Sequence, residues 1–238
     1  MTKIMPLEER SIDNHIDDHV DKEIQDCFSV DAPKCFFVFA GAGSGKTRSL
    51  INTLTFLDKE RGESLLMNGK QIAVITYTNA ACDEISKRLQ YKPIFSVSTI
   101  HSFLWDLIKS YQADIKEWIT QSVKKEIEEL RQKQLKGRGG KVGEKRAEDI
   151  RKKTERLAKI ETVKKFSYNP NGNNVGYDAL SHSEVVKMST EFIAMEPTMQ
   201  DILTAKYPIL LIDESQDTKK ELVDALLIVC EKYKDRFI

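Results

Sequence analysis

The sequence has no excess of charge of either sign, since 37 lysines and arginines balance 37 aspartates and glutamates over 238 residues. This neutrality argues against nucleic-acid binding by the whole surface, although it is compatible with a local basic patch. No apolar run approaches the ~20 residues needed to cross a bilayer. The N-terminus is acidic and polar, where a signal peptide would be basic and then apolar. We therefore expect a cytoplasmic protein without a membrane partner.

Cysteine is scarce, and its spacing excludes the usual metal frameworks. The four cysteines are Cys27, Cys35, Cys82 and Cys230, with no C-x-x-C pair and no histidine at metal spacing. Two of them lie in apolar segments, so we expect reduced, structural thiols in an intracellular protein. The sequence also has no internal repeat. Its length and 40% hydrophobic content fit one large domain or a domain with an inserted subdomain.

A glycine-rich segment, "AGAGSGKT", matches the phosphate-loop pattern G-x-x-x-x-G-K-[ST] except at its first position, which is alanine. Glycines let successive backbone N–H groups turn toward an anion, and a following helix directs its positive end to the same place. The pattern predicts a nucleotide-phosphate site; the alternative is a glycine-rich turn without a ligand. The candidate residues are Ala40, Gly41, Ala42, Gly43, Ser44, Gly45, Lys46 and Thr47.

The surroundings of this loop have the order strand, loop, helix that a phosphate loop requires. Residues 35–40 are an uninterrupted apolar run, typical of a parallel strand buried on both faces. Apolar residues then recur at helical spacing from Leu50 to Leu57. Lys46 would reach the β- and γ-phosphates of ATP, and the Thr47 hydroxyl would bind Mg²⁺.

Further strands are predicted at 71–76, 94–100 and 209–213, with helices between the early ones. This order predicts an α/β fold, a parallel sheet flanked by helices. The 108 residues from 101 to 208 are too many for an ordinary crossover, so they imply an insertion. We expect the insertion to be mainly helical. The predicted parts are 1–103 (first part of the ATP-binding lobe), 104–185 (inserted helical subdomain) and 186–238 (return to the lobe).

Charge is distributed unevenly along the chain. Residues 1–32 carry a net charge of −6, and residues 111–166 carry +7. The basic stretch contains two predicted charged helices, one with an apolar stripe from Ile119 to Leu130 and one running to Ile160. A flexible joint is predicted between them at 135–143. A solvated helical surface is the simplest interpretation of this stretch; contact with DNA is the alternative.

The segment "ILLIDESQDT" supplies the acidic residues that a phosphate loop needs. Asp213 follows an apolar strand and would hold Mg²⁺ through its hydration shell. Glu214 would orient and deprotonate the water that attacks the γ-phosphate.

Together with "AGAGSGKTR", "AVITYTNAACDEISKRL" and "STIHSF", this segment resembles motifs of the UvrD/Rep-like superfamily 1 helicases. The resemblance implies a RecA-like P-loop NTPase lobe with an inserted helical subdomain, and ATP and Mg²⁺ as cofactors. It implies that Gln216 is catalytic and that Arg48 lines the nucleotide. It also implies that Gln25, sixteen residues before Gly41, reads the adenine edge; the alternative is a surface glutamine.

The resemblance also implies a path for single-stranded DNA. Tyr77 would stack on a base, or would be a core aromatic at a strand end. His101 would lie on the strand-binding surface, or would be a packed histidine. Neutral phosphate contacts are expected from Thr78, Asn79, Thr99 and Ser102. Ala80 departs from the lysine usual in the family, which puts one backbone contact to DNA in doubt.

The resemblance implies that the chain is the N-terminal half of a 3′ to 5′ translocase acting on single-stranded or tailed duplex DNA. The second RecA-like lobe and its arginines have no counterpart in the sequence, so we expect residues 1–238 alone to bind ATP without unwinding DNA. Two alternatives remain. One is a stand-alone P-loop ATPase or switch, and the other is a lobe that serves as a module for unidentified protein partners.

Overall fold

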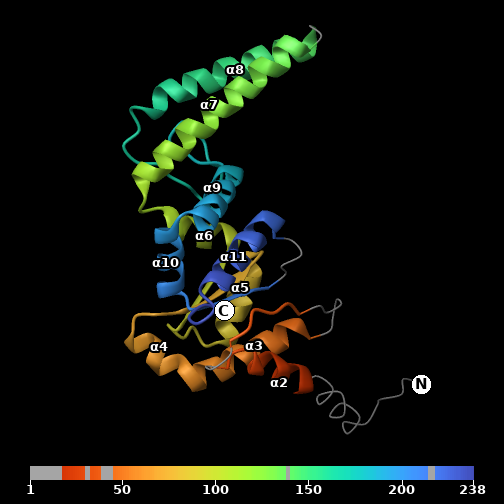
Figure 1. The fold of residues 1–238 in the computed structure, drawn as a ribbon, viewed down its shortest axis with the longest axis vertical. Coiled ribbons are helices and arrows are strands. Elements are labelled where there is room, and N and C mark those ends of the chain that lie inside the picture. Colours follow the sequence, from red (N-terminus) through yellow and green to blue (C-terminus); the bar gives the residue numbers. More distant parts are fainter. Residues whose placement is uncertain (1–17, 30–32, 39–44, 138–139, 214–217) are drawn as a thin grey trace, which may run out of the picture. The chain divides into compact units, whose positions relative to one another are not determined.

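The computed structural model describes residues 18–29, 33–38, 45–137, 140–213 and 218–238 (Figure 1). The chain is a mixed α/β protein with a small parallel sheet and many helices. It divides into two compact units. The first combines the described residues up to Ile100 with Ile193–Ile238, and the second is His101–Phe192. The predicted domain limits at 103 and 186 remain predictions.

Three parallel strands form the sheet of the first unit, in the order β2-β1-β3. They are β1 (Ile72–Thr76), β2 (Phe95–Thr99) and β3 (Ile209–Ile212). Their apolar, β-branched sequences suit a sheet covered on both faces. All five residues of β1 are buried, as expected of the central strand. The strands predicted at 71–76, 94–100 and 209–213 are therefore confirmed, and so is their parallel pairing.

The strand predicted at 35–40 is wrong for the four of its residues that the structure describes, 35–38. These residues are irregular, and the side chain of Phe37 is 51% exposed. Phe36 alone turns inward, where its ring meets that of Phe28 edge-on at 5.5 Å. The apolar run at 35–40 did not predict the structure correctly. A short apolar run does not distinguish a strand buried on both faces from a segment that packs a single side chain.

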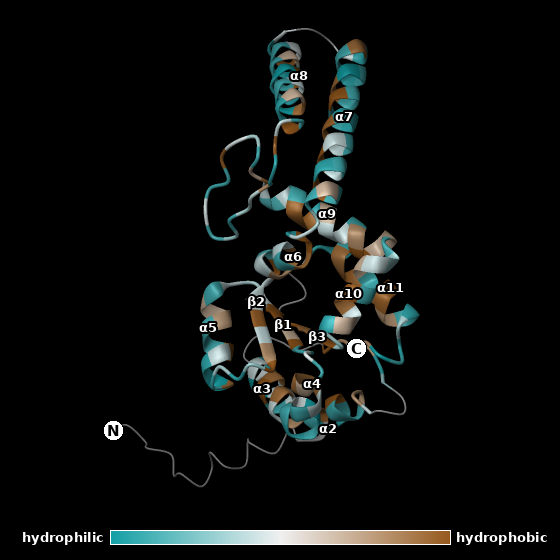
Figure 2. Cartoon of the chain, turned by 90° about the vertical axis from the view of Figure 1, so that its left-hand side faces the viewer, coloured by the Kyte–Doolittle hydropathy of each residue, from teal (hydrophilic) through white to brown (hydrophobic). Residues whose placement is uncertain are grey.

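One face of the sheet packs on α3 (Lys46–Leu57). Leu54 and Leu57 of α3 are fully buried in a cluster with Ile72 and Val74 of β1, which confirms the helix predicted after the phosphate loop. Figure 2 shows the apolar strands above this helix. The other helices of the unit are α2 (Asp18–Asp26), α4 (Glu63–Met67), α5 (Asn79–Arg88), α10 (Pro197–Lys206) and α11 (Lys220–Lys232), with a π-helical turn η1 (Asp58–Gly62).

The second unit is built from α6 (Ile100–Ile108), α7 (Gln112–Lys136), α8 (Lys141–Ile160) and α9 (His182–Met195), of which α6 and α9 reach a few residues into the first unit. The helices α7 and α8 pack side by side and are largely hydrophilic (Figure 2). The predicted stripe is confirmed from Ile119 to Ile127, which are buried on α7. Residues 168–176 form no helix or strand, and Ser167 makes an isolated parallel bridge to Ala179.

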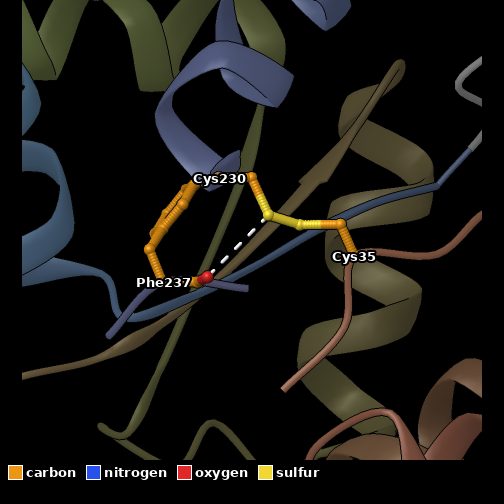
Figure 3. Close-up of a disulfide and its surroundings, with 3 residues drawn as sticks. All are labelled: Cys35, Cys230 and Phe237. Atoms are coloured by element: carbon orange, nitrogen blue, oxygen red, sulfur yellow. Dashed lines mark hydrogen bonds between the residues drawn. A yellow bond between two sulfur atoms is a disulfide. The ribbon is translucent and has the colours of Figure 1, made fainter. Parts of the chain in front are cut away.

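The cysteines differ from the prediction. Cys35 and Cys230 form a disulfide between the segment that precedes the phosphate loop and helix α11 (Figure 3). The expectation of four reduced thiols is therefore wrong, and Cys27 and Cys82 are the free cysteines. Spacing could not reveal this pair, because the two residues are 195 positions apart and only the fold brings them together. The Cys230 Sγ also lies 3.8 Å from the carbonyl oxygen of Phe237.

No helix among the residues that the structure describes is both long enough and apolar enough to span a bilayer.

Candidate functional site

The N-terminus of α3 has features that favour anion binding. Gly45 precedes the helix with φ +82°, a left-handed conformation that favours glycine. Its carbonyl accepts hydrogen bonds from the backbone N–H groups of Arg48 (2.8 Å) and Ser49 (3.1 Å). No acidic residue lies in the first turn. The positive end of the helix dipole is thus not neutralised by a carboxylate of its own first turn.

The structure describes three of the predicted nucleotide-site residues at the start of α3 beside Gly45. Lys46 and Thr47 form the first turn of α3 and are half-buried, and the Arg48 side chain is exposed. The loop residues Ala40, Gly41, Ala42, Gly43 and Ser44 lie outside the described residues.

Asp213 lies at the carboxyl end of β3, directly after Ile212. Its backbone N–H donates to the Ile75 carbonyl of β1 at 2.8 Å, which extends the pairing of the two strands by one residue. Ligands of open parallel α/β sheets bind beyond the carboxyl ends of the strands, so Asp213 stands at the edge where a nucleotide is expected. The catalytic candidates Glu214 and Gln216 follow it and lie outside the described residues.

Two of the predicted metal ligands suit Mg²⁺ by their chemistry. A threonine hydroxyl (Thr47) and a carboxylate (Asp213) are hard oxygen ligands, the kind that Mg²⁺ takes. Among the described residues, no group of three or more His, Cys, Asp or Glu side chains could hold a metal ion.

Gln25 lies on α2, which packs against α3. The amide of Asn52 on α3 donates to the Asp21 carboxylate on α2 at 2.7 Å. Gln25 itself is half-buried. The helix that carries the candidate adenine-reading residue is therefore held beside the helix that carries Lys46 and Thr47.

The first set of candidate DNA-contact residues follows β1. Tyr77 is 52% exposed, which argues against the alternative of a core aromatic. The Thr78 hydroxyl accepts a hydrogen bond from the Ala81 backbone N–H at 3.2 Å and caps α5. Asn79 is the first residue of that helix. Tyr77 is thus displayed on a rigid turn between a buried strand and a capped helix.

The second set follows β2. Thr99 is the last residue of the strand and is buried, while His101 and Ser102 are half-buried in α6. Thr99 belongs to the first unit, and His101 and Ser102 belong to the second. The hydroxyl that was expected to meet a DNA phosphate at Thr99 is the least accessible of the set.

The side chains around His101 were not predicted from the sequence. Its ring meets the His182 ring edge-on at 5.0 Å, and the His182 Nδ1 lies 2.5 Å from the Tyr168 hydroxyl. Burial raises the pKa of Tyr168 to about 12, so this phenol is neutral near pH 7. Trp105 meets the Tyr168 ring at 5.7 Å. Neither a lone tyrosine in a loop nor a lone histidine at the start of a helix has a spacing that identifies it in advance.

Comparison with known proteins places these observations in a family. The model of the UvrD/REP helicase N-terminal domain matches residues 23–177, more than half of the chain. The chain belongs to this family. The match includes α3 with its left-handed Gly45, the strands β1 and β2, and the turn that displays Tyr77.

Two curated relatives are similar to the chain. The "Gabija protein GajB" of Bacillus cereus is 27% identical over 82% of this chain and 38% of its own length. The "Probable DNA helicase II homolog" of Mycoplasma capricolum is 30% identical over 39% of this chain and 13% of its own length. The chain thus spans well under half the length of the curated relatives it matches.

Proposed function

We propose that the chain is the ATP-binding lobe of an ATP-dependent DNA helicase or translocase of the UvrD/Rep type. The observation that carries the proposal is the geometry of the first unit, in a member of the UvrD/REP helicase family. A left-handed glycine opens α3, which covers the sheet, and Asp213 ends a strand of that sheet. These are the parts that a RecA-like P-loop NTPase uses to bind a nucleotide with its metal.

The residues divide the work at this site. Lys46 would neutralise the β- and γ-phosphates, while Thr47 and Asp213 would hold Mg²⁺. The metal, when bound, neutralises charge that develops on the phosphates. Glu214 accepts the proton of the attacking water, and Gln216 contributes to the same catalytic segment. Gln25 reads the adenine edge and Arg48 lines the nucleotide.

The energy of hydrolysis is used on DNA. We propose that single-stranded DNA, or the single-stranded tail of a duplex, passes over Tyr77, Thr78 and Asn79, with Thr99, His101 and Ser102 as further contacts. Movement is 3′ to 5′ and requires a second RecA-like lobe, because a ligand shifts an equilibrium only through different affinities for two states. The greater length of both relatives supports a longer working protein. The cytoplasm, where DNA is accessible, is the proposed location.

Nucleotide binding by three variants tests the proposal. Lys46→Ala removes the charge that faces the phosphates and should weaken Mg-ATP binding by about 10–150-fold, the range for a lost charge-assisted hydrogen bond. Glu214→Gln should leave binding intact and abolish hydrolysis in the longer protein. Lys59→Ala removes an exposed lysine of η1 and should change nothing. Wild-type protein that fails to bind a fluorescent ATP analogue, or equal losses in all three variants, would reject the assigned site.

A further inference from the structure

The hydroxyl of Thr76 is an unpaired polar group in the interior of the first unit. Thr76 is the last residue of β1 and is 1% exposed. Its Oγ1 has no hydrogen-bond partner among the described residues. An unsatisfied buried hydroxyl destabilises a folded protein, and native structures contain few of them. A bound water or ligand that completes the hydrogen bond is the usual explanation.

The sheet register shows what surrounds this hydroxyl. Side chains alternate along a strand, so Thr76 points to the same face as Ile72 and Val74, the face that packs on α3. Thr76 pairs with Thr99 on β2. On the other side of β1, Ile75 pairs with Ile212 of β3. Asp213, the residue after β3, therefore lies at the level of Thr76. Thr99, Thr76 and Asp213 therefore form a row across the carboxyl edge of the sheet, on the face of the phosphate-loop helix.

A second threonine provides a contrast. Thr53 is also buried and its Oγ1 also lacks a partner, but it lies in the middle of α3, two turns from Lys46. Its neighbours Leu54 and Leu57 belong to the apolar cluster. Unlike Thr76, Thr53 does not lie at the edge where a ligand would bind, and its hydroxyl is an unsatisfied polar group within the core.

We propose that the Thr76 hydroxyl oxygen accepts a hydrogen bond from a water of the hydrated Mg²⁺–nucleotide complex, beside Asp213. Thr76 is thus a positioning residue of the nucleotide site, acting on the metal's water shell and, through it, on Asp213. This assignment rests on the proposed nucleotide-binding function. It also explains why the protein retains a hydroxyl that costs stability while the site is empty.

Replacing Thr76 by valine, which has the same shape without the hydroxyl, separates the two effects. In the free protein, Thr76→Val should raise the melting temperature by about 2–4 °C, the shift expected for relief of one unsatisfied group. Affinity for Mg-ADP should fall by about 3–10-fold, the range for one lost hydrogen bond. Affinity for ADP in EDTA should equal that of wild type, because the bond exists only with the metal's water. Thr76→Ser keeps a hydroxyl and should restore Mg-ADP binding.

Thr53→Val is the matched control, and should raise the melting temperature in the same way without changing either affinity. The assignment is overturned if Thr76→Val binds Mg-ADP as tightly as wild type, or if it loses the same factor with and without Mg²⁺. Failure of the wild-type protein to bind ADP at all would instead reject the proposed function on which the assignment rests. Titration calorimetry and thermal unfolding supply all these values.

Discussion

Tyr77 is the most informative single side chain for DNA binding, because a half-exposed aromatic ring at the end of a buried strand gains nothing for the fold. Tyr77 is 52% exposed, although it directly follows the buried residues of β1. Thr78 then fixes the turn by capping α5. A ring held in this way loses little conformational entropy when a base stacks on it, so a nucleic-acid contact explains its exposure.

Tyr77→Ala should therefore weaken binding of single-stranded DNA by about 1–3 kcal/mol, the stacking energy of one base, and leave thermal stability unchanged. Tyr77→Phe should bind almost as wild type. Tyr91→Ala is a matched control, since Tyr91 is 72% exposed but precedes β2 and so lies near the opposite edge of the sheet. Fluorescence anisotropy with a labelled oligonucleotide measures the affinities. Undiminished binding by Tyr77→Ala would remove this residue from the DNA path.

At this scale the sequence predicted residues whose role lies in a local pattern. Lys46, Thr47 and Asp213 belong to short segments whose chemistry requires those side chains, and the structure places Lys46 and Thr47 at a helix N-terminus and Asp213 at a strand end. Thr76 was not predicted as a site residue, because what distinguishes it is an unpaired hydroxyl, and that depends on the neighbours that the fold supplies. His182 and Tyr168 were not predicted either, because only the fold brings their side chains together.

At the scale of elements, strands and helices with strong periodicity were predictable and isolated apolar runs were not. The strands β1, β2 and β3 are short, mainly apolar segments that alternate with helices, which identifies them. Residues 35–38 have a similar composition but form no strand, because Phe36 packs beside Phe28 while Phe37 faces solvent. Both charged helices were predicted: α7 from its four-residue apolar repeat, and α8, which ends at Ile160 as expected although Ile160 is the only residue that it buries.

The start of α9 is fixed by a capping box joined to an ion pair. Ser181 and Glu184 exchange hydrogen bonds, with the Ser181 backbone N–H donating to Glu184 at 2.9 Å and the Glu184 N–H donating to the Ser181 hydroxyl at 3.3 Å. Arg156 of α8 donates to both oxygens of Glu184, at 2.6 and 3.3 Å. Burial alone would raise the pKa of Glu184, but the bonds from Arg156 and Ser181 hold its pKa below the ordinary value.

This arrangement predicts a pH dependence of stability. Because the folded-state pKa of Glu184 is lowered, its contribution is present above the unfolded pKa and is lost as pH falls through the folded pKa. Arg156→Ala should lower the free energy of unfolding by about 1.5–3 kcal/mol at pH 7 and by less at a pH below the folded-state pKa of Glu184, where the carboxylate is protonated. Arg151→Ala breaks only an exposed pair with Glu155 and should cost little. Urea unfolding at both pH values measures the difference, and a pH-independent loss would contradict the ion-pair account.

At the scale of the whole molecule, sequence length between motifs was the useful signal. The 108 residues between the third and fourth predicted strands indicated an insertion, and a separate compact unit, His101–Phe192, occupies most of that interval. Long-range pairing of particular side chains was not predictable. Cys35 and Cys230 occur in unrelated segments, and neither has a neighbour in sequence that marks it as half of a bridge.

The bridge between Cys35 and Cys230 closes a loop of nearly the whole chain, so it should stabilise the protein chiefly by restricting the unfolded state. Loss of a bridge of this size costs about 2–5 kcal/mol. Cys35 is exposed, which makes Cys35→Ser the cleaner change, because serine at buried Cys230 would add an unpaired hydroxyl. Protein oxidised with glutathione disulfide should melt at a higher temperature than the same protein in dithiothreitol, and Cys35→Ser should melt at the lower temperature in both.

Cys82→Ser is the control, since Cys82 is a free thiol whose pKa is raised to about 11 by burial and by neighbouring Asp83. It should keep the response of the melting temperature to reductant. Thiol titration of the oxidised, urea-unfolded protein should find two reactive groups, Cys27 and Cys82, against four after reduction. Four thiols in the oxidised sample would show that Cys35 and Cys230 stay apart, and would restore the original expectation of reduced cysteines. Cys35 precedes the predicted phosphate loop. The ADP affinities of the folded protein in its oxidised and in its reduced form therefore show whether the disulfide also constrains the nucleotide site.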